Sequence, residues 1–370
     1  MPKQSNYDII DSIIINLEKE WSQVMSSSIP QEKWEEPKYS KKQIDLAGKT
    51  IANPNIEPEE RHAALEVLNN WRSSHAYPLQ VITSNLRLNN KNAIVVQRLK
   101  RLDSIIEKLE RYPTMSLYRM GDLGGCRVIV DSIDDVYKSV ERYKNSRIRH
   151  ILKRETDYIV NPKTSGYRSY HLIYQFHSDT KETYNKNMLI EIQFRTKLQH
   201  IWATAIEMMG IYTKTSLKSS MGDESILRFF VLVSSVFAKM ENMPICPDTT
   251  DDYNELIEEI REIDRTTNIV SRISALSTAV NYVNKNTAYK NANYYILILN
   301  YEQKRLKIHQ YKPSQIELAT KIYNQIEAQC SSSIDTVLVS ATSFDTLKAA
   351  YPNYFTDISE FVEIMRRILA

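Results

Sequence analysis

The spacing of hydrophobic residues divides the 370-residue chain into helical and strand-like parts. Residues 1–86 carry apolar positions at helical intervals, as in DIIDSIIINLEKEW, and predict an N-terminal helical region. A further basic helix is predicted over 89–112, which ends before Pro113. Between 114 and 213 the pattern changes, and the segments CRVIV, YHLIYQFH and MLIEIQF predict β-strands.

Polar and apolar side chains alternate along the last of these strands. Ile190, Ile192 and Phe194 fall on one face, whereas Glu191 and Gln193 fall on the other. A helix is expected from about residue 196. Helices between strands indicate an α+β fold, in which a mixed β-sheet is flanked by helices.

The remainder of the chain predicts long helices and then a small α+β unit. YYILILN and RLKIHQY flank the turn YEQK and predict a hairpin, followed by a helix over 314–328 and a strand over 335–341. A closing helix over 357–369 has Asp357 and Glu360 at capping-box spacing. The predicted domains are therefore 1–86, 87–215, 216–290 and a C-terminal regulatory domain, 291–370.

Composition narrows the class of protein. The hydrophobic content of 42% and charged content of 25% are typical of a globular protein. No apolar run is long enough to cross a bilayer and no secretory signal is recognisable, so we expect a cytoplasmic protein without a membrane partner. Between residues 87 and 154, Lys and Arg outnumber Asp and Glu two to one, which suits a phosphate-rich ligand or a solvated surface.

Two carboxylates next to strand-like segments are the first candidates for catalysis. Asp122 precedes one predicted strand, and Glu191 interrupts another, where an unpaired charge would be costly. Mg²⁺ that carries ATP phosphates is commonly held by one or two carboxylates, although either acid alone could be an ion-pair or turn residue. Gln193 and Arg195 share the face of Glu191.

Basic residues upstream suit a polyphosphate. On the helix predicted over 89–112, Arg98, Arg101 and Lys108 share roughly one side, with Lys100 offset. Such a row could neutralise a triphosphate, and the alternative is an exposed basic helix face.

The segment KTSGYRSYH combines a turn, an aromatic ring and cations. Gly166 permits a tight turn from which Tyr167 could stack on a nucleobase, or else anchor the core. The neighbouring candidates for phosphate donors are Lys163, Arg168 and His171. Competing motifs are absent from the sequence, including GxxxxGK[ST], HExxH, GxSxG and any His-Asp dipeptide.

Residues 87–215 resemble the synthetase domain of the RelA/SpoT family, the (p)ppGpp synthetases. Four motifs occur in the family's order. Their positions are Arg98, Lys100, Ser104 and Lys108; Asp122, Gly125 and Arg127; Pro162, Lys163, Gly166, Tyr167, Ser169 and His171; and Glu191, Gln193, Arg195 and Thr196.

The resemblance implies transfer of the β,γ-pyrophosphate of ATP to a ribose 3′-hydroxyl. Asp122 and Glu191 would bind Mg²⁺, and Glu191 would also activate the hydroxyl. Tyr167 would stack on the acceptor base. The remaining nucleotide-binding positions that the motifs imply are Arg98, Lys100, Lys108 and Arg127 around ATP, Lys163 and His171 on the acceptor phosphates, and Gln193 and Arg195.

The size of the chain and its C-terminal α+β unit are similar to those of the CapRel group, fused toxin–antitoxin members of this family. That resemblance implies pyrophosphorylation of the 3′-CCA end of tRNA, which inhibits translation. It also implies inhibition by a C-terminal Y-x-x-Y motif, here Tyr351 and Tyr354, which a phage capsid protein relieves.

Three functions remain open at this point. They are a self-inhibited tRNA pyrophosphokinase of phage defence, an alarmone synthetase acting on GDP or GTP, and an inactive nucleotide- or RNA-binding regulator. A basic run favours the tRNA acceptor, because tRNA binding needs a wide phosphate-contacting surface. Its members are Lys144, Arg147, Arg149, Lys153 and Arg154.

Overall fold

The computed structural model describes residues 6–25, 34–213, 217, 222–277, 281–283, 293–300, 303, 305–329, 334–355 and 358–370. The helices are α1 (Asn6–Met25), α2 (Lys41–Ile51), α3 (Pro58–Ser74), α4 (Ala76–Asn89), α5 (Leu102–Arg111), α6 (Ile133–Lys144), α7 (Lys197–Thr213), α8 (Glu224–Met240), α9 (Tyr253–Thr267), α10 (Ile269–Ser277), α11 (Ile316–Gln329), α12 (Phe344–Ala350), α13 (Pro352–Phe355) and α14 (Ser359–Leu369). The strands are β1 (Ile94–Leu99), β2 (Gly124–Val130), β3 (Ile151–Asp157), β4 (Tyr170–Gln175), β5 (Leu189–Thr196), β6 (Asn281–Val283), β7 (Tyr294–Asn300), β8 (Arg305–Tyr311) and β9 (Ile334–Ser340).

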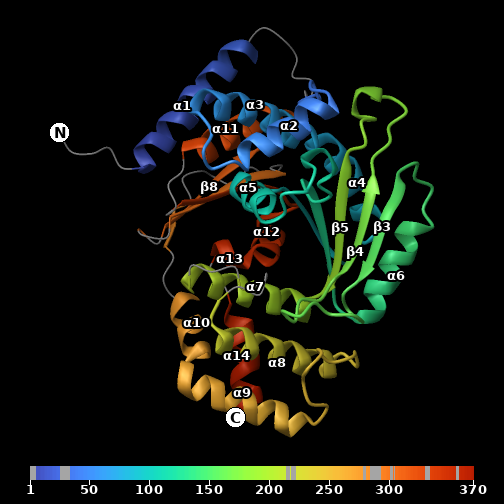
Figure 1. Cartoon of the computed structure of the whole chain (residues 1–370), viewed down its shortest axis with the longest axis vertical. Helices are drawn as coiled ribbons and strands as arrows, with labels where there is room; N and C mark the ends of the chain where they lie inside the picture. The colour runs from blue at the N-terminus through green and yellow to red at the C-terminus, as the bar shows by residue number, and fades with distance from the viewer. Residues whose placement is uncertain are drawn as a thin grey trace, which may run out of the picture.

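These strands form one sheet in the order β3-β4-β5-β2-β1-β9-β7-β8-β6 (Figure 1). β2 and β5 are parallel, whereas β1 pairs antiparallel with β2, and β4 with β5. The predicted α+β fold with a mixed sheet and flanking helices is therefore confirmed.

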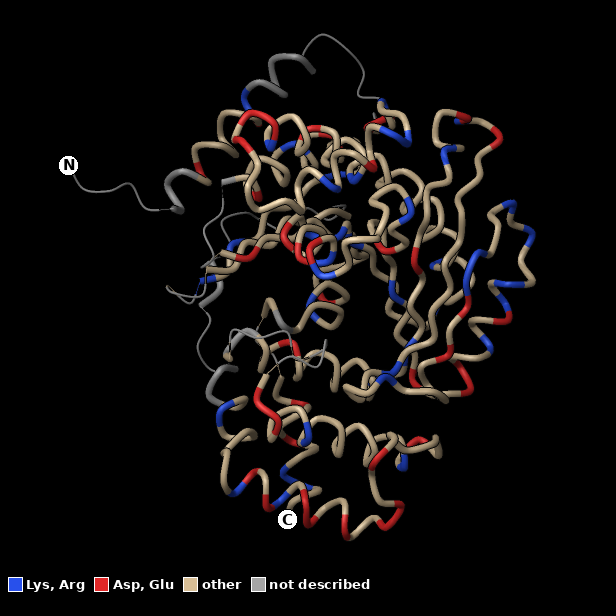
Figure 2. The backbone as a smooth tube through the Cα atoms, in the orientation of Figure 1, with Lys and Arg blue, Asp and Glu red and all other residues tan. Residues whose placement is uncertain are grey.

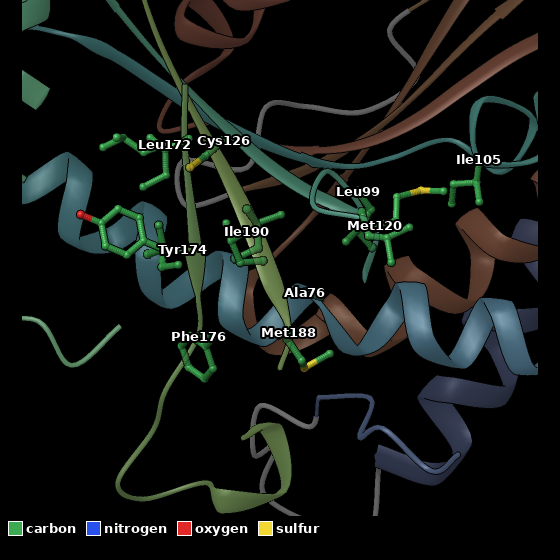
Figure 3. Packing of buried hydrophobic residues seen from close by; sticks show 14 of the residues in the cluster. Ala76, Leu99, Ile105, Met120, Cys126, Leu172, Tyr174, Phe176, Met188 and Ile190 are labelled. Atoms are coloured by element: carbon green, nitrogen blue, oxygen red, sulfur yellow. The ribbon is translucent and has the colours of Figure 1, made fainter. Parts of the chain in front are cut away.

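The largest hydrophobic core lies between one face of β1, β2, β4 and β5 and the helices α2 to α6. Figure 3 shows Cys126, Leu172 and Ile190, from β2, β4 and β5, in this core together with Ala76 at the start of α4. The alternation predicted for β5 is confirmed, since Ile190 and Ile192 are fully buried on the core side. The opposite face of these strands is thereby left for polar side chains.

The single helix predicted over 89–112 is wrong. The segment forms β1 and then α5, which begins only at Leu102. Val95 and Val96 are buried, and β1 pairs along its whole length with β2, so pairing and packing outweigh the helical spacing of the charges. As a result Arg98 lies on a strand and Lys108 on a helix, and the predicted shared helix face does not exist.

The last eighty residues continue the same sheet rather than forming a sheet of their own. β7 and β8 form the predicted hairpin, and β9 joins β1 through the pairs Gln97–Ser340 and Arg98–Val339. Helices α1 and α11 cover one face of β7–β9, and α12 and α13 cover the other. Asp357 and most of the turn 301–304 lie outside the described residues, and the domain boundaries stay predictions.

A bundle of α7, α8, α9, α10 and α14 packs below the sheet around a second core (Figure 1). Acidic residues follow α9 along the outer side of this bundle, as Figure 2 shows. Within the described ranges, no helix is both long and apolar enough to cross a membrane.

Candidate active site

A cavity of about 490 Å³ opens on the polar face of β1, β2, β4 and β5. All the positions to which the four motifs assign catalysis or nucleotide binding line it. These residues are Arg98, Lys100, Lys108, Asp122, Arg127, Lys163, Tyr167, His171, Glu191, Gln193 and Arg195. Tyr351 from the C-terminal residues also lines the cavity, whereas Tyr354 does not.

Strand register explains how distant residues meet. Gln193 on β5 pairs with His171 on β4 and with Arg127 on β2, which places the three side chains in one row across the sheet. In the adjacent row, Gly125 lies between Glu191 and Arg98. A Cβ atom added at Gly125 would meet nothing nearer than the Glu191 carbonyl oxygen, at 3.9 Å. The glycine therefore forms an open floor between an acid and a cation.

Asp122, in the turn before β2, is held by two lysines. Lys108 Nζ lies 2.9 Å from each of its carboxylate oxygens, and Lys100 Nζ lies 3.1 Å from Oδ2. Burial acts to raise the pKa of Asp122, but the charges of Lys100 and Lys108 hold it below its ordinary value. The acid is therefore ionised and already surrounded by positive charge.

Glu191 belongs to a chain of hydrogen bonds along the polar face. Its Oε1 lies 3.0 Å from His171 Nδ1, and its Oε2 accepts a 2.6 Å bond from Gln193, which in turn accepts one from Arg195. Burial would raise the pKa of Glu191, but the charge and hydrogen bond of His171, aided by Gln193, lower it to about 2. His171 Nε2 lies 3.0 Å from the Tyr167 hydroxyl and extends the chain to the turn.

The arginines of the cavity are suited to an anionic ligand. The Nε atoms of Arg127 and Arg195 are buried and have no hydrogen-bond partner among the described residues. Burial, with the nearby charges of Arg195 and Arg98, lowers the pKa of Arg127 to about 9. Buried donors without acceptors are costly, and phosphate oxygens would satisfy them.

The turn before β4 depends on Gly166. Its φ is +84°, and an added Cβ would lie 3.0 Å from Ser234 and 3.2 Å from Trp202. The turn places Lys163 Nζ over the ring of Tyr167, 5.1 Å from its centre. Tyr167 itself is 8% exposed and packs against the helical bundle, so its ring is only partly presented to the cavity.

One predicted phosphate donor has a different place. Arg168 is buried and faces away from the cavity, where it donates to the Ile159 carbonyl oxygen at 2.6 Å and to Ser234 at 3.0 Å. It holds the turn against α8, so its prediction as a phosphate donor is wrong. The sequence shows that Arg168 is charged but not where its side chain points. That direction depends on the packing of α8, which is distant in sequence.

Several residues that were not predicted also line the cavity. Tyr158 is the most informative, because Lys163 Nζ lies over its ring at 4.7 Å, so that the lysine contacts two tyrosine rings. Its position at the end of a strand, nine residues before Tyr167, was the available signal. Arg119 and Glu207 line the cavity as well, and no motif pointed to them.

The C-terminal residues reach the cavity through α12 and the residue after it. Ala350, the last residue of α12, accepts a hydrogen bond from Arg127 at 3.2 Å, and the Ala349 carbonyl oxygen lies 3.1 Å from His200 Nε2. The Tyr351 hydroxyl donates to the Gln97 carbonyl oxygen at 3.1 Å. The carbonyl group of Ala350 thus takes up one donor of an arginine that lines the cavity.

The residues present fit a divalent cation that arrives with a nucleotide. Asp122 and Glu191 line the same cavity and influence each other electrostatically. Among the described residues, no group of three or more acidic, histidine or cysteine side chains could hold a metal ion alone. Two carboxylates with substrate phosphates are a usual ligand set for Mg²⁺, which completes its coordination with water.

Comparison with known proteins agrees with this geometry. Residues 97–216 match the family described as "Region found in RelA / SpoT proteins". The GTP pyrophosphokinase YjbM of Bacillus subtilis (strain 168) is 36% identical over 112 residues, which cover 30% of this chain and 52% of that protein. The GTP pyrophosphokinase YwaC of the same organism is 35% identical over 134 residues, or 34% of this chain and 62% of that protein.

A solved structure is also similar to this chain. Small alarmone synthetase 1 from Bacillus subtilis, bound to its product pppGpp, aligns with a TM-score of 0.37 and 24% identity, over 45% of this chain and 90% of that one. The residues that match the RelA/SpoT family description include all four motifs found in the sequence. The matches span only about half to three fifths of the two curated relatives.

Proposed function

We propose that this chain transfers a pyrophosphoryl group from ATP to a ribose 3′-hydroxyl, with Mg²⁺ held by Asp122 and Glu191. One observation carries the proposal: a single cavity contains two ionised carboxylates, a set of cations and an aromatic ring on a turn. The match of residues 97–216 and the names of the similar proteins support the same chemistry.

The donor nucleotide binds between β1, β2 and α5. Arg98 and Arg127, together with Lys100 and Lys108, supply charge-assisted hydrogen bonds to the triphosphate. Arg127 and Arg195 have buried Nε donors that phosphate oxygens would satisfy. Fixed donors of this kind stabilise charge as it develops on the transferred group.

In the transfer step, the acceptor 3′-oxygen attacks the β-phosphorus of ATP. The bond between that phosphorus and the oxygen that bridges to the α-phosphate breaks, and AMP leaves with the bridging oxygen. The proton of the hydroxyl passes to the carboxylate of Glu191, which His171 and Gln193 orient. When bound, Mg²⁺ supplies charge neutralisation on the phosphate oxygens.

The proposed acceptor is the 3′-CCA end of tRNA. Arg154 lines the cavity, and Lys153 precedes it on β3, the edge strand of the sheet. These residues provide a basic surface that continues outward from the acceptor side of the cavity. Two other members of the basic run, Lys144 and Arg149, are paired with Glu155 and Asp179 and contribute less free charge.

The second candidate acceptor is GDP or GTP. It is favoured by the similar proteins, which are named GTP pyrophosphokinases. An inactive nucleotide- or RNA-binding regulator is the third candidate. The presence of Asp122, Glu191 and Tyr167 in one cavity argues against an inactive protein.

The C-terminal residues inhibit transfer in this proposal. Tyr351 and the carbonyl of Ala350 occupy the donor side, next to Arg127. ATP and the Ala350 carbonyl oxygen would therefore compete for Arg127. In phage defence, a trigger such as a capsid protein would bind the state in which Tyr351 has left the cavity.

Labelled transfer tests the proposal. The protein is incubated with γ-³²P-ATP, Mg²⁺ and either deacylated tRNA or GDP and GTP, and EDTA is added in parallel reactions. We expect label in tRNA and none with EDTA. Label confined to guanine nucleotides would select the second candidate. No label in either acceptor, including with the Tyr351→Ala variant, would select the third.

Substitution of Tyr167 tests whether its ring stacks on the acceptor base. Because stacking of a base on an aromatic ring contributes about 1–3 kcal/mol, Tyr167→Ala is expected to raise KM for the acceptor about 5- to 150-fold. Tyr167→Phe keeps the ring and loses the hydrogen bond to His171, so its KM should stay within a few-fold. Equal loss in both variants would assign the effect to the hydroxyl and contradict stacking.

A further inference from the structure

A carboxylate from the C-terminal residues caps the N-terminus of α5. Arg101, at the N-cap of α5, provides no side-chain hydrogen bond to that helix. Instead, Glu327 of α11 accepts a 3.1 Å hydrogen bond from the Leu102 backbone amide through Oε1. The same oxygen accepts a bond from the Tyr323 hydroxyl at 2.8 Å. The start of α5 therefore depends on a residue far away in sequence.

The other oxygen of Glu327 pairs with Arg72 of α3. The Arg72 side chain is fully buried, donates to Asn324 Oδ1 at 2.5 Å, and lies over the ring of Tyr323 at 5.0 Å. Arg72 Nη1 also lies 3.5 Å from the carbonyl oxygen of Lys100. One buried carboxylate thus ties α3, residues 100–102 and α11 together.

These contacts lie directly behind the donor side of the cavity. Lys100 precedes the capped helix, and Lys108 is on it; both lysines hold Asp122. The Lys100 amide also donates to the Leu123 carbonyl oxygen at 2.8 Å, which links the segment to the turn of Asp122. A shift of residues 100–102 would move both lysines relative to the acid.

We infer that Glu327 is a positioning residue for the donor site, acting through the α5 N-terminus and Arg72 on Lys100 and Lys108. The inference rests on the proposed function, since these lysines are assigned to ATP there. It divides the C-terminal residues into two parts with opposite effects. Glu327 of α11 supports the donor site, whereas Tyr351 lines the cavity and Ala350 accepts a hydrogen bond from Arg127.

The test compares variants in the full chain, in a Tyr351→Ala background that leaves the cavity open. Because hydrogen bonds to charged groups contribute about 1.5–3 kcal/mol, Glu327→Gln is expected to raise KM for ATP about 10- to 100-fold. KM for the acceptor should stay unchanged. Glu317→Gln is the matched control on the same helix, because Glu317 pairs with Lys321 of α11; it should leave both KM values unchanged.

A double variant separates positioning from stability. A buried ion pair can be replaced by apolar residues with little loss of stability, so Arg72→Met with Glu327→Met should restore the thermal midpoint lost in Glu327→Gln. It cannot restore the cap on Leu102, so KM for ATP should remain raised. Recovery of KM together with the thermal midpoint would show that Glu327 acts through stability alone and would overturn the inference.

Hydrogen–deuterium exchange gives a readout that does not depend on catalysis. Amides of residues 99–110 should exchange faster in Glu327→Gln and in the double variant than in the parent. Unchanged exchange would overturn the inference even where transfer to tRNA is observed. If these variants exchange faster but their parent transfers no label, the result would count against the proposed function. It would then also exclude any role of Glu327 in that reaction.

Discussion

Replacement of Glu191 by glutamine is expected to lower pyrophosphate transfer about a thousandfold, as loss of a general base typically costs 10²–10⁴ in rate. The carboxylate is ionised. Burial would raise its pKa, but His171 and Gln193 lower the pKa to about 2. Glutamine has the same shape but neither accepts the acceptor proton nor provides a charged metal ligand. Single-turnover transfer of label from ATP measures the effect.

The control for this variant is Asp131→Asn. Asp131 follows β2 at the far end from the cavity and forms an exposed pair with Lys197, so its loss should leave transfer unchanged. Circular dichroism and the thermal midpoint should be similar in both variants and the parent. A Glu191→Gln protein that transfers within tenfold of the parent would rule out Glu191 as base and metal ligand.

Removal of the Tyr351 side chain is expected to activate the protein. Tyr351→Ala opens the donor side next to Arg127 and removes the hydrogen bond to the Gln97 carbonyl oxygen. Coupling energies between sites are commonly 1–3 kcal/mol, so transfer should rise about 5- to 150-fold. In cells, the variant should stop growth at expression levels that the parent protein tolerates.

Tyr354 provides the matched control. It is buried in the same hydrophobic cluster as Tyr351, yet it does not line the cavity. Tyr354→Ala alone should therefore disturb packing without opening the donor side. If both single variants activate equally, loss of packing around α13 explains the effect. If the double variant leaves growth unchanged, the C-terminal residues do not inhibit the enzyme.

The sequence was sufficient for elements whose pattern is local. The alternation in β5 correctly assigned the faces of Glu191 and Ile190, because a strand side chain has only two directions. The motif residues were correctly expected to lie together, although their individual roles stay predictions. The turn at Gly166 has the positive φ that its glycine suggested.

The failures involve partners that are distant along the chain. The segment 89–112 was predicted as one helix, and only pairing with β2 and β9 makes its first part a strand. Arg168 was misplaced because its acceptors lie in a loop and in α8. The pairing of β9 with β1 had no local signal, so the C-terminal residues appeared as a separate unit.

The Arg72–Glu327 pair joins residues that are 255 positions apart in sequence. At about 5–20 residues per second, a ribosome needs roughly 13–50 s to reach the glutamate after the arginine has been made. During that time the nascent chain lacks both Tyr351 and the carboxylate that caps the start of α5. A chain organised in this way would gain the cap on α5 only late in its synthesis, shortly before Tyr351 is added.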